Sequence, residues 1–307
     1  DDQSEGVAAG IEKACEAAGV DPESVTEFSH AMTVSVNALL ENDGARTALV
    51  TTEGFRDVLE IGRQTRPSLY DLDAEKPAPL VPRRRRFEVP ERATADGVER
   101  PVEDEAIDSL VADLRDADVE SVAVCLLHAY AHPENEERVA DALRDALDVP
   151  VSASHEVLPE FREYERTSTT VVDAYVRPAI DGYVGRLTER ARDLGLPQPK
   201  IMQANGGVTD AGTVRRNAVT TVLSGPAAGV VGASATAGAD ADREGLITFD
   251  MGGTSSDVSL VRDGEVERTT ESAIADRPIG TPMVDVETVG AGGGSIAWVD
   301  AGGALRI

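Results

Sequence analysis

Hydrophobic positions along the chain follow two repeats, one typical of helices and one typical of strands. Val7, Ile11 and Cys15 recur at helical spacing before Gly19, so we expect a helix over residues 5–19. Further on, helical segments alternate with short apolar runs rich in β-branched residues, which is the pattern of an α/β domain. The expected elements are strands at 26–32, 47–52, 121–127 and 149–153 and helices at 103–116 and 134–147. The pattern therefore predicts an α/β fold.

The middle of the chain is predicted to form one long or broken helix over residues 160–194, with Pro178 as the site of a kink. A soft domain boundary is placed near its start, dividing the chain into residues 1–166 and 167–307. The sequence opens at Asp1 without a methionine and stops just after a strand-like segment. We therefore expect it to be a piece of a longer protein.

Residues 246–261 form the stretch with the clearest chemical signature. A β-branched and aromatic run ends at Asp250, two glycines follow, and alternation resumes at Val258. This order predicts a strand, a tight glycine turn and a second strand. A dinucleotide fingerprint or a Walker loop would lead from its glycines into a helix, so both motifs are disfavoured. The prediction is a β-hairpin with an unusually polar turn.

The turn of this hairpin carries groups that suit a phosphate. Gly252 and Gly253 have no Cβ, so their backbone N–H groups can approach an anion and wrap around it. Thr254, Ser255 and Ser256 add hydroxyl donors for phosphate oxygens. The turn is therefore a candidate phosphate-binding loop.

Two carboxylates flank the turn. Asp250 and Asp257 are suited to holding a hydrated Mg²⁺ through water, or to orienting an attacking water. Asp250 is the stronger catalytic candidate, because Asp257 could equally cap the turn. The alternative is an ordinary hairpin turn in which aspartate and glycine serve only the backbone conformation. From the hairpin alone, both interpretations stay open.

Composition excludes several classes of function. The formal charge is −27, and only three of the 29 basic residues are lysines, which suits a protein that stays soluble in high salt, as in a halophile. Nucleic acid binding is disfavoured, because no basic stripe with interleaved aromatic residues occurs, and the one basic run, residues 83–86, is short and is expected at a solvated strand edge or loop. No apolar run approaches the ~20 residues of a membrane span. The cysteines Cys15 and Cys125 form no ligand pair, which favours a reducing cytoplasm.

Other polar or glycine-rich positions remain as candidates. Gly292 and Gly293 belong to a glycine cluster that either lines the same cleft as the hairpin or forms a bulge-rich bend. His30, near the end of the strand predicted at 26–32, and Asn37, which follows that strand, are candidates to face a substrate, although a lone histidine at such a place is more often structural. The four histidines do not have the spacing of a metal site.

A helix of small residues precedes the hairpin. Residues 225–238 are expected to be helical, with Ser224 as a cap and Pro226 in the first turn. A helix without large side chains permits close backbone approach, as at a hinge between domains, or tight packing on a sheet. Together with an Asp-x-Gly-Gly-Thr hairpin, this helix resembles the interdomain connection and second phosphate loop of the actin-like ATPase superfamily.

Longer motifs narrow the resemblance to the hydantoinase A / 5-oxoprolinase family. They cover nearly the whole chain in the right order: Val50-Thr51-Thr52-Glu53-Gly54-Phe55-Arg56-Asp57-Val58-Leu59-Glu60-Ile61-Gly62-Arg63-Gln64, Ser154-His155-Glu156-Val157-Leu158-Pro159, Glu163-Tyr164-Glu165-Arg166-Thr167-Ser168-Thr169 and Val289-Gly290-Ala291-Gly292-Gly293-Gly294-Ser295-Ile296. The resemblance implies an actin-like ATPase (ribonuclease H-like) two-domain fold that is incomplete in this chain.

The resemblance also implies an activity. Such enzymes use ATP and Mg²⁺ to phosphorylate the carbonyl oxygen of a hydantoin, N-methylhydantoin or 5-oxoproline ring, and then hydrolyse the activated ring. The implied partner is a hydantoinase B-type subunit or domain, in a hetero-oligomer. Two alternatives stay open: an acetone-carboxylase-like subunit that phosphorylates its substrate, and an actin-fold chaperone or filament ATPase that is not a lactam enzyme.

The sequence departs from the family pattern in two places. A first phosphate hairpin is expected upstream of residues 5–19 and an adenosine-side glycine motif beyond Ile307, so the fragment alone is expected to be inactive. In the segment that starts at His30, Ala31 and Met32 replace the Gly-Thr that the family normally has. This replacement removes a flexible residue and a hydroxyl from a segment that is a candidate for contacting substrate.

Overall fold

The N-terminal half is built around a four-stranded parallel sheet. The computed structural model describes residues 2–66, 68–71, 73–237 and 245–307. The sheet has the strand order β3-β2-β6-β7, formed by Arg86–Val89, Thr47–Thr52, Ser121–Cys125 and Val151–Ala153. All its neighbouring strands run parallel, which requires crossover connections and buries both faces. The predicted α/β fold is confirmed here.

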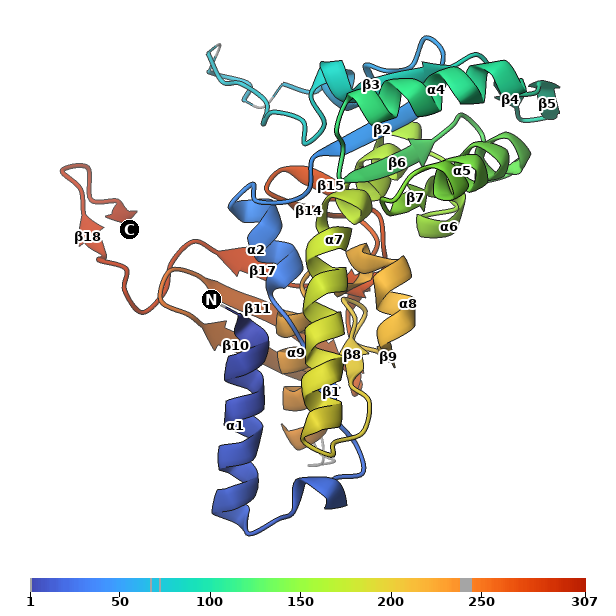
Figure 1. Cartoon of the computed structure of the whole chain (residues 1–307). Helices are drawn as coiled ribbons and strands as arrows, with labels where there is room; N and C mark the ends of the chain where they lie inside the picture. Colours follow the sequence, from blue (N-terminus) through green and yellow to red (C-terminus); the bar gives the residue numbers. More distant parts are fainter. Residues whose placement is uncertain (1, 67, 72, 238–244) are drawn as a thin grey trace.

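Alternation along the strands divides the apolar side chains of this sheet between two cores. Val50 and Val124 pack with helices α4 (Asp104–Asp116) and α5 (Glu134–Ala146) on one face. Leu49 and Ala123, one residue earlier in each strand, pack on the other face against the long helix α7 (Glu163–Asp193). The period of two therefore assigns each residue to one layer (Figure 1).

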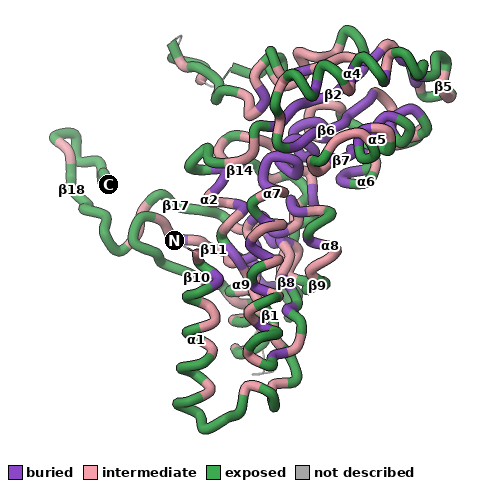
Figure 2. Tube along the Cα trace, in the orientation of Figure 1, coloured by how far each residue is buried: buried purple, intermediate pink, exposed green. Residues whose placement is uncertain are grey.

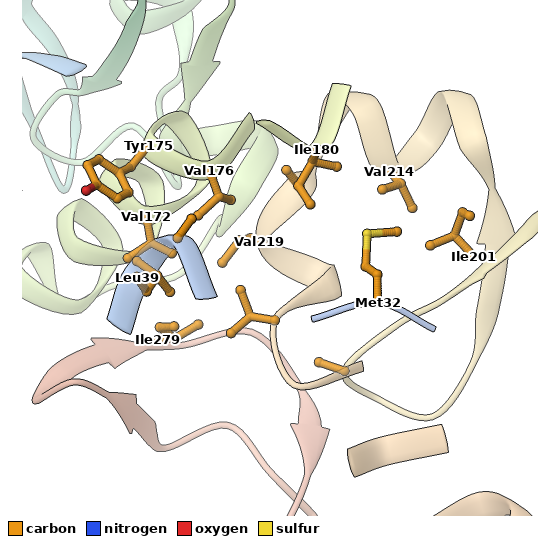
Figure 3. Close-up of a cluster of buried hydrophobic side chains, with 14 of the residues drawn as sticks. Met32, Leu39, Val172, Tyr175, Val176, Ile180, Ile201, Val214, Val219 and Ile279 are labelled. Atoms are coloured by element: carbon orange, nitrogen blue, oxygen red, sulfur yellow. The ribbon is translucent and has the colours of Figure 1, made fainter. Parts of the chain in front are cut away.

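Helix α7 is a single helix of 31 residues that contains Pro178. Proline removes one backbone hydrogen bond, but Val176 and Ile180 on either side of it are fully buried and hold the helix in place. The same helix contributes Val172 and Tyr175 to a second hydrophobic core, shown in Figure 3. This core also receives α1 (Gln3–Ala18), which confirms the helix predicted at 5–19, and α2 (Val34–Leu40).

A three-stranded sheet lies beside this core, with the strand order β1-β8-β9 formed by Ser29–His30, Lys200–Met202 and Val208–Asp210. The strand predicted at 26–32 is shorter than expected. Only Ser29 and His30 pair with β8, because at Met32 the backbone turns and exchanges hydrogen bonds with the Ser224 hydroxyl instead. The structured segments that follow β9 are α8 (Ala211–Arg216) and the 3₁₀ turn Ala218–Thr221.

The C-terminal part contains the hairpin. Strand β10 (Gly245–Met251) pairs antiparallel with β11 (Ser256–Arg262), and β11 also pairs with β12 (Glu265–Val266) and β17 (Glu287–Val289). Helix α9 (Ser224–Ala237) contacts this sheet. The helix predicted at 225–238 is confirmed over its described residues, and residue 238 lies outside them. The predicted strand–turn–strand order is also confirmed.

Short elements complete the fold. They are α3 (Val58–Ile61), α6 (Ser154–Val157), the 3₁₀ turns Pro22–Ser24 and Arg83–Arg85, the hairpins β4–β5 (Arg92–Thr94, Gly97–Arg100), β14–β15 (Ser272–Ile274, Arg277–Ile279) and β18–β19 (Trp298–Val299, Leu305–Arg306), and the pair β13–β16 (Arg268–Thr269, Met283–Val284). Across the described ranges, no helix combines the length and apolar character needed to cross a bilayer.

The basic run at 83–86 does not lie at a solvated strand edge as a whole. Arg86 is buried in β3, and its guanidinium donates to the Val81 carbonyl and the Glu60 carboxylate at 2.9 Å each. The expectation of a solvated edge or loop was therefore wrong for Arg86. A buried arginine with several acceptors is a structural anchor, because its charge is compensated where it lies.

Candidate functional site

The register of the hairpin places the two candidate carboxylates side by side. Asp250, near the end of β10, is the direct cross-strand partner of Asp257 in β11. Residues directly opposite each other in an antiparallel pair have their Cβ atoms about 4.5–5.5 Å apart and share one face of the sheet. The sequence alone placed both residues near the turn, and the strand register shows that they are directly opposed cross-strand neighbours.

The paired carboxylates lie on the face of the sheet that meets helix α9. On that face, the cross-strand pair Leu246 and Val261 packs with Ala227 and Val230 of the helix. Since side chains alternate, positions 248 and 250 of β10 continue the same row toward the turn. Along this face, the side chains are therefore apolar beneath the helix and become carboxylates near the turn. On the opposite face of β10, Ile247, Phe249 and Met251 are exposed (Figure 2 colours each residue by its burial).

A cleft of about 400 Å³ runs between α9 and the hairpin. The small side chains of α9 leave this space open, since Gly229, Ala233 and Ala237 line it. Asp250 and Asp257 line it from the strands. The cleft is therefore an apolar groove with two carboxylates on its wall.

A third residue completes the row of Asp250 and Asp257. Thr288 in β17 is the cross-strand partner of Asp257, and its hydroxyl donates a 2.7 Å hydrogen bond to Asp257 Oδ1. This bond fixes one oxygen of the Asp257 carboxylate and leaves Asp250 without such a restraint among the described residues. Sequence reasoning missed Thr288, because β17 is only three residues long and gives no periodic signal.

The turn between the strands is closed by its own backbone. Gly252 N–H donates to the Ser255 carbonyl at 2.9 Å, so this amide is not free for an anion. The amides of Gly253 and Thr254 donate to no acceptor within the described ranges, and both residues are exposed. Ser256 differs from the prediction, because its side chain is buried and donates to the Ala291 carbonyl at 2.7 Å. Its hydroxyl therefore holds the turn in place and does not face a phosphate.

The glycine cluster lies directly against this turn. Gly293 N–H donates to the Gly252 carbonyl at 2.9 Å, and Gly294 N–H donates to the Gly253 carbonyl at 2.8 Å. A Cβ on Gly292 would lie 2.7 Å from the Gly252 carbonyl oxygen, so this position has no room for a side chain. The structure thus brings the predicted residues Gly292 and Gly293 together with the hairpin.

His30 and Asn37 lie elsewhere. His30 Nε2 is hydrogen-bonded to the Tyr183 hydroxyl at 2.8 Å, and burial lowers the pKa of His30, so its ring is neutral at neutral pH. Asn37 lines a separate groove with Glu41 and Asp43, next to α7. Neither residue lines the cleft beside Asp250. Their role toward a substrate stays a prediction.

The unusual residue Met32 has a structural explanation. Its side chain is buried in the core shown in Figure 3, and the Ser224 hydroxyl bonds its backbone N–H and carbonyl at 3.3 and 3.0 Å. A larger apolar side chain at this position therefore fills the core where β1 meets the start of α9. No group of three or more histidine, cysteine, aspartate or glutamate side chains that could hold a metal lies within the described ranges.

A hairpin with paired aspartates and a glycine turn, preceded by a helix of small residues, is the arrangement expected of an actin-like ATPase fold. The chain belongs to the hydantoinase/oxoprolinase family: residues 1–147 match the model of the hydantoinase/oxoprolinase N-terminal region, and residues 166–307 match that of hydantoinase/oxoprolinase.

Three relatives illustrate the family. The alpha subunit of caprolactamase from Pseudomonas jessenii is 38% identical over 283 residues, which cover 90% of this chain and 40% of the subunit. The crystal structure of that ATP-dependent caprolactamase aligns with a TM-score of 0.85 at 35% identity, over 95% of this chain and 44% of the other. The 5-oxoprolinase 1 of Arabidopsis thaliana is 38% identical over 284 residues, 86% of this chain and 22% of the relative.

A solved structure of acetone carboxylase without nucleotide is also similar and aligns with a TM-score of 0.82 at 26% identity. The alignment covers 99% of this chain and 45% of the other. The fold expected from the sequence is thereby confirmed, and the chain spans less than half the length of each relative.

Proposed function

We propose that the chain is the nucleotide-binding part of an ATP-dependent enzyme that opens the ring of a cyclic amide. The observation that carries the proposal is the opposed pair of Asp250 and Asp257 beside a turn with exposed amides. The relatives named as caprolactamase and 5-oxoprolinase support the reaction class. Because the chain spans less than half of those proteins, the activity belongs to the whole protein.

The residues present fit a magnesium-bound nucleotide. Two like charges at directly opposed positions destabilise a sheet, so the pair of Asp250 and Asp257 is favoured when a cation compensates it. Carboxylates and water are the ligands that Mg²⁺ prefers, and it is commonly held through one or two carboxylates plus phosphates. The free amides of Gly253 and Thr254 suit phosphate oxygens, as backbone N–H groups do in other anion sites.

Each residue of the site has a role in this proposal. Bound ATP supplies the phosphoryl group that makes the ring's amide oxygen part of a leaving group. Asp250 orients the reacting groups or a metal-bound water, and Asp257, held by Thr288, supplies a fixed negative charge beside it. The residues of the turn hold the phosphates, which positions the nucleotide instead of reacting with it.

The proposed partner is a B-type subunit that completes the hydrolysis. The Pseudomonas jessenii relative is named as an alpha subunit, which supports assembly into a hetero-oligomer. The ring is a hydantoin, an N-methylhydantoin, a 5-oxoproline or a caprolactam. These rings share one amide bond to be opened and differ in the groups around it.

The test is nucleotide hydrolysis by the full-length protein with its B-type partner, in high salt, with and without each ring. We expect hydrolysis stimulated by one ring and lowered about 100-fold or more by Asp250→Asn, the scale seen when a preorganised transition-state contact is removed. Asp263→Asn is the matched control, since Asp263 lies in the β11–β12 turn with a left-handed φ of 51° that asparagine tolerates. Equal activity of both variants would refute the role of Asp250.

The acetone carboxylase structure supports a second candidate function, that of a subunit that phosphorylates a ketone or the bicarbonate that reacts with it. That reading predicts nucleotide hydrolysis that responds to acetone with bicarbonate and ignores every ring. The same assay separates the two candidates when both sets of substrates are included.

A further inference from the structure

The glycine cluster at 290–294, called the glycine loop below, forms a second layer of backbone against the turn of the hairpin. Its amides at 293 and 294 donate to the carbonyls of Gly252 and Gly253. The Ser256 hydroxyl adds a third bond, at 2.7 Å, to the carbonyl of Ala291. Two hydrogen bonds therefore tie the turn, residues 252–255, to the loop, and a third ties the first residue of β11 to it.

These bonds determine where the free amides of the turn point. In a trans peptide the C=O and the following N–H point in opposite directions, and no described peptide of this chain is cis. When the Gly252 carbonyl faces the glycine loop, the Gly253 N–H must face away from it. The Gly253 carbonyl likewise turns the Thr254 N–H away from the loop. Two successive N–H groups thus point out of the same side of the turn.

Successive N–H groups on one side of a turn form a concave donor pair that binds anions. The carbonyls of the same peptides would repel a phosphate, and the loop holds both of them away from that side by donating its N–H groups to them. The residues carrying the donors are exposed, so an anion can reach them. The loop therefore determines that N–H donors, and not carbonyl oxygens, face the exposed side of the turn.

The absence of a side chain at Gly292 is what permits this close approach. A Cβ there would lie 2.7 Å from the Gly252 oxygen, 2.8 Å from the Gly253 carbonyl carbon and 2.8 Å from the Ser255 nitrogen. All three atoms belong to backbone, so no side chain can rotate away to make room. A Cβ on Gly293 would meet nothing closer than 3.6 Å, which is an ordinary contact.

We propose that the glycine loop holds the hairpin turn so that the N–H groups of Gly253 and Thr254 receive the phosphate oxygens of the nucleotide, with Gly292 as the positioning residue. Gly292 acts through the turn and does not touch the ligand. The proposal rests on the nucleotide-binding function proposed above and assigns the atoms that carry it.

The experiment compares Gly292→Ala with Gly290→Ala in the full-length protein, because a Cβ on Gly290 would meet nothing within 4 Å. Alanine is compatible with the backbone at both positions, because neither glycine has a positive φ. Binding of ATP with Mg²⁺ and of adenosine is measured by calorimetry. We expect Gly292→Ala to weaken ATP binding about tenfold or more, the size expected for lost hydrogen bonds to a charged group. Adenosine binding stays within about twofold, and Gly290→Ala binds both ligands like the parent protein.

Adenosine separates positioning from a general loss of structure. A loosened fold would weaken both ligands, whereas misaligned phosphate donors weaken only ATP. Equal ATP affinity in the two variants, or a parallel loss of ATP and adenosine binding in Gly292→Ala, overturns the proposal. Failure of the parent protein to bind ATP would instead refute the nucleotide-binding function itself.

A second variant keeps the test decisive where Gly292→Ala does not fold. Ser256→Ala removes only the hydrogen bond to the Ala291 carbonyl and leaves all backbone contacts in place. We expect a several-fold loss of ATP affinity with adenosine binding unchanged, because one neutral hydrogen bond is worth about 1 kcal/mol, or a factor of about five. ATP affinity equal to that of the parent protein overturns the proposal.

Discussion

Substituting Glu136 by glutamine would test a buried charge network in the N-terminal half. The Glu136 side chain, on α5, has an exposed fraction of 0%. Its two oxygens accept hydrogen bonds from Leu126 N at 2.7 Å, Ser154 Oγ at 2.9 Å and His155 N at 2.8 Å. They also accept from His155 Nδ1 at 2.8 Å. One carboxylate therefore joins the end of β6 to helix α6.

Glutamine cannot satisfy the donors around position 136. Whichever oxygen becomes an NH₂ group, at least one N–H donor then faces another donor and is left buried without an acceptor. An orphaned buried donor costs about 1–3 kcal/mol, and the remaining bonds lose the assistance of the charge. We expect the free energy of unfolding to fall by about 2–4 kcal/mol at pH 6, which corresponds to a Tm lower by about 3–6 °C for a chain of 307 residues.

The penalty of Glu136→Gln should also depend on pH. Burial lowers the pKa of His155, but the hydrogen bond and the charge of Glu136 outweigh burial and raise that pKa above its ordinary value. A raised histidine pKa stabilises the fold fully below the unfolded pKa of about 6.5, and this stabilisation is lost as pH rises through the folded pKa. The difference between the parent protein and the variant is therefore larger at pH 5.5 than at pH 9.

Urea unfolding at both pH values, followed by circular dichroism, measures this difference. Glu137→Gln serves as the control, because Glu137 is an exposed neighbour on the same helix and is expected to change stability by no more than about 0.5 kcal/mol. A Glu136→Gln penalty below 1 kcal/mol, or one that is the same at the two pH values, would refute the reasoning.

Two further outcomes follow from the packing. A Cβ at Gly44 would overlap the ring of Tyr175, so Gly44→Ala should destabilise the protein by about 1–3 kcal/mol, whereas Gly10→Ala, in open space within α1, should stabilise it by about 0.5–1 kcal/mol. Thermal unfolding of both variants checks the pair, and a loss at Gly10 or none at Gly44 would contradict it. Thr288→Val removes the hydroxyl that holds Asp257 and should lower ATP hydrolysis several-fold, while Thr288→Ser keeps the bond and should retain activity. Steady-state hydrolysis tests this, and equal loss in both variants would show that the hydroxyl is not responsible.

Much of the fold could be predicted from local patterns. Alternation and two glycines were sufficient to place β10, the turn and β11, because hairpin strands are adjacent in sequence. The helices at 103–116 and 134–147 also lie where the helical repeat placed them, at Asp104–Asp116 and Glu134–Ala146. These elements could be predicted because the spacing of their own apolar residues indicates the face that becomes buried.

The contacts that complete the site could not be predicted in the same way. The stacking of Gly292 on the turn joins residues about forty positions apart and depends on a register that no local pattern encodes. The bond from Thr288 to Asp257 depends on the pairing of a three-residue strand. Ser256 was assigned to phosphate because sequence reports its hydroxyl but not the direction in which the pleat points it.

Helix α7 has a consequence for how the protein can be divided. Its 31 residues extend about 46 Å and supply side chains to both hydrophobic cores that flank it. The two family matches end and begin around residues 147 and 166, close to the start of this helix. A chain ended at that junction would lose α7 and expose Leu49 and Ala123 of the parallel sheet to water. The segments matched by the two family models therefore share their hydrophobic cores, and neither carries a complete interior without the other.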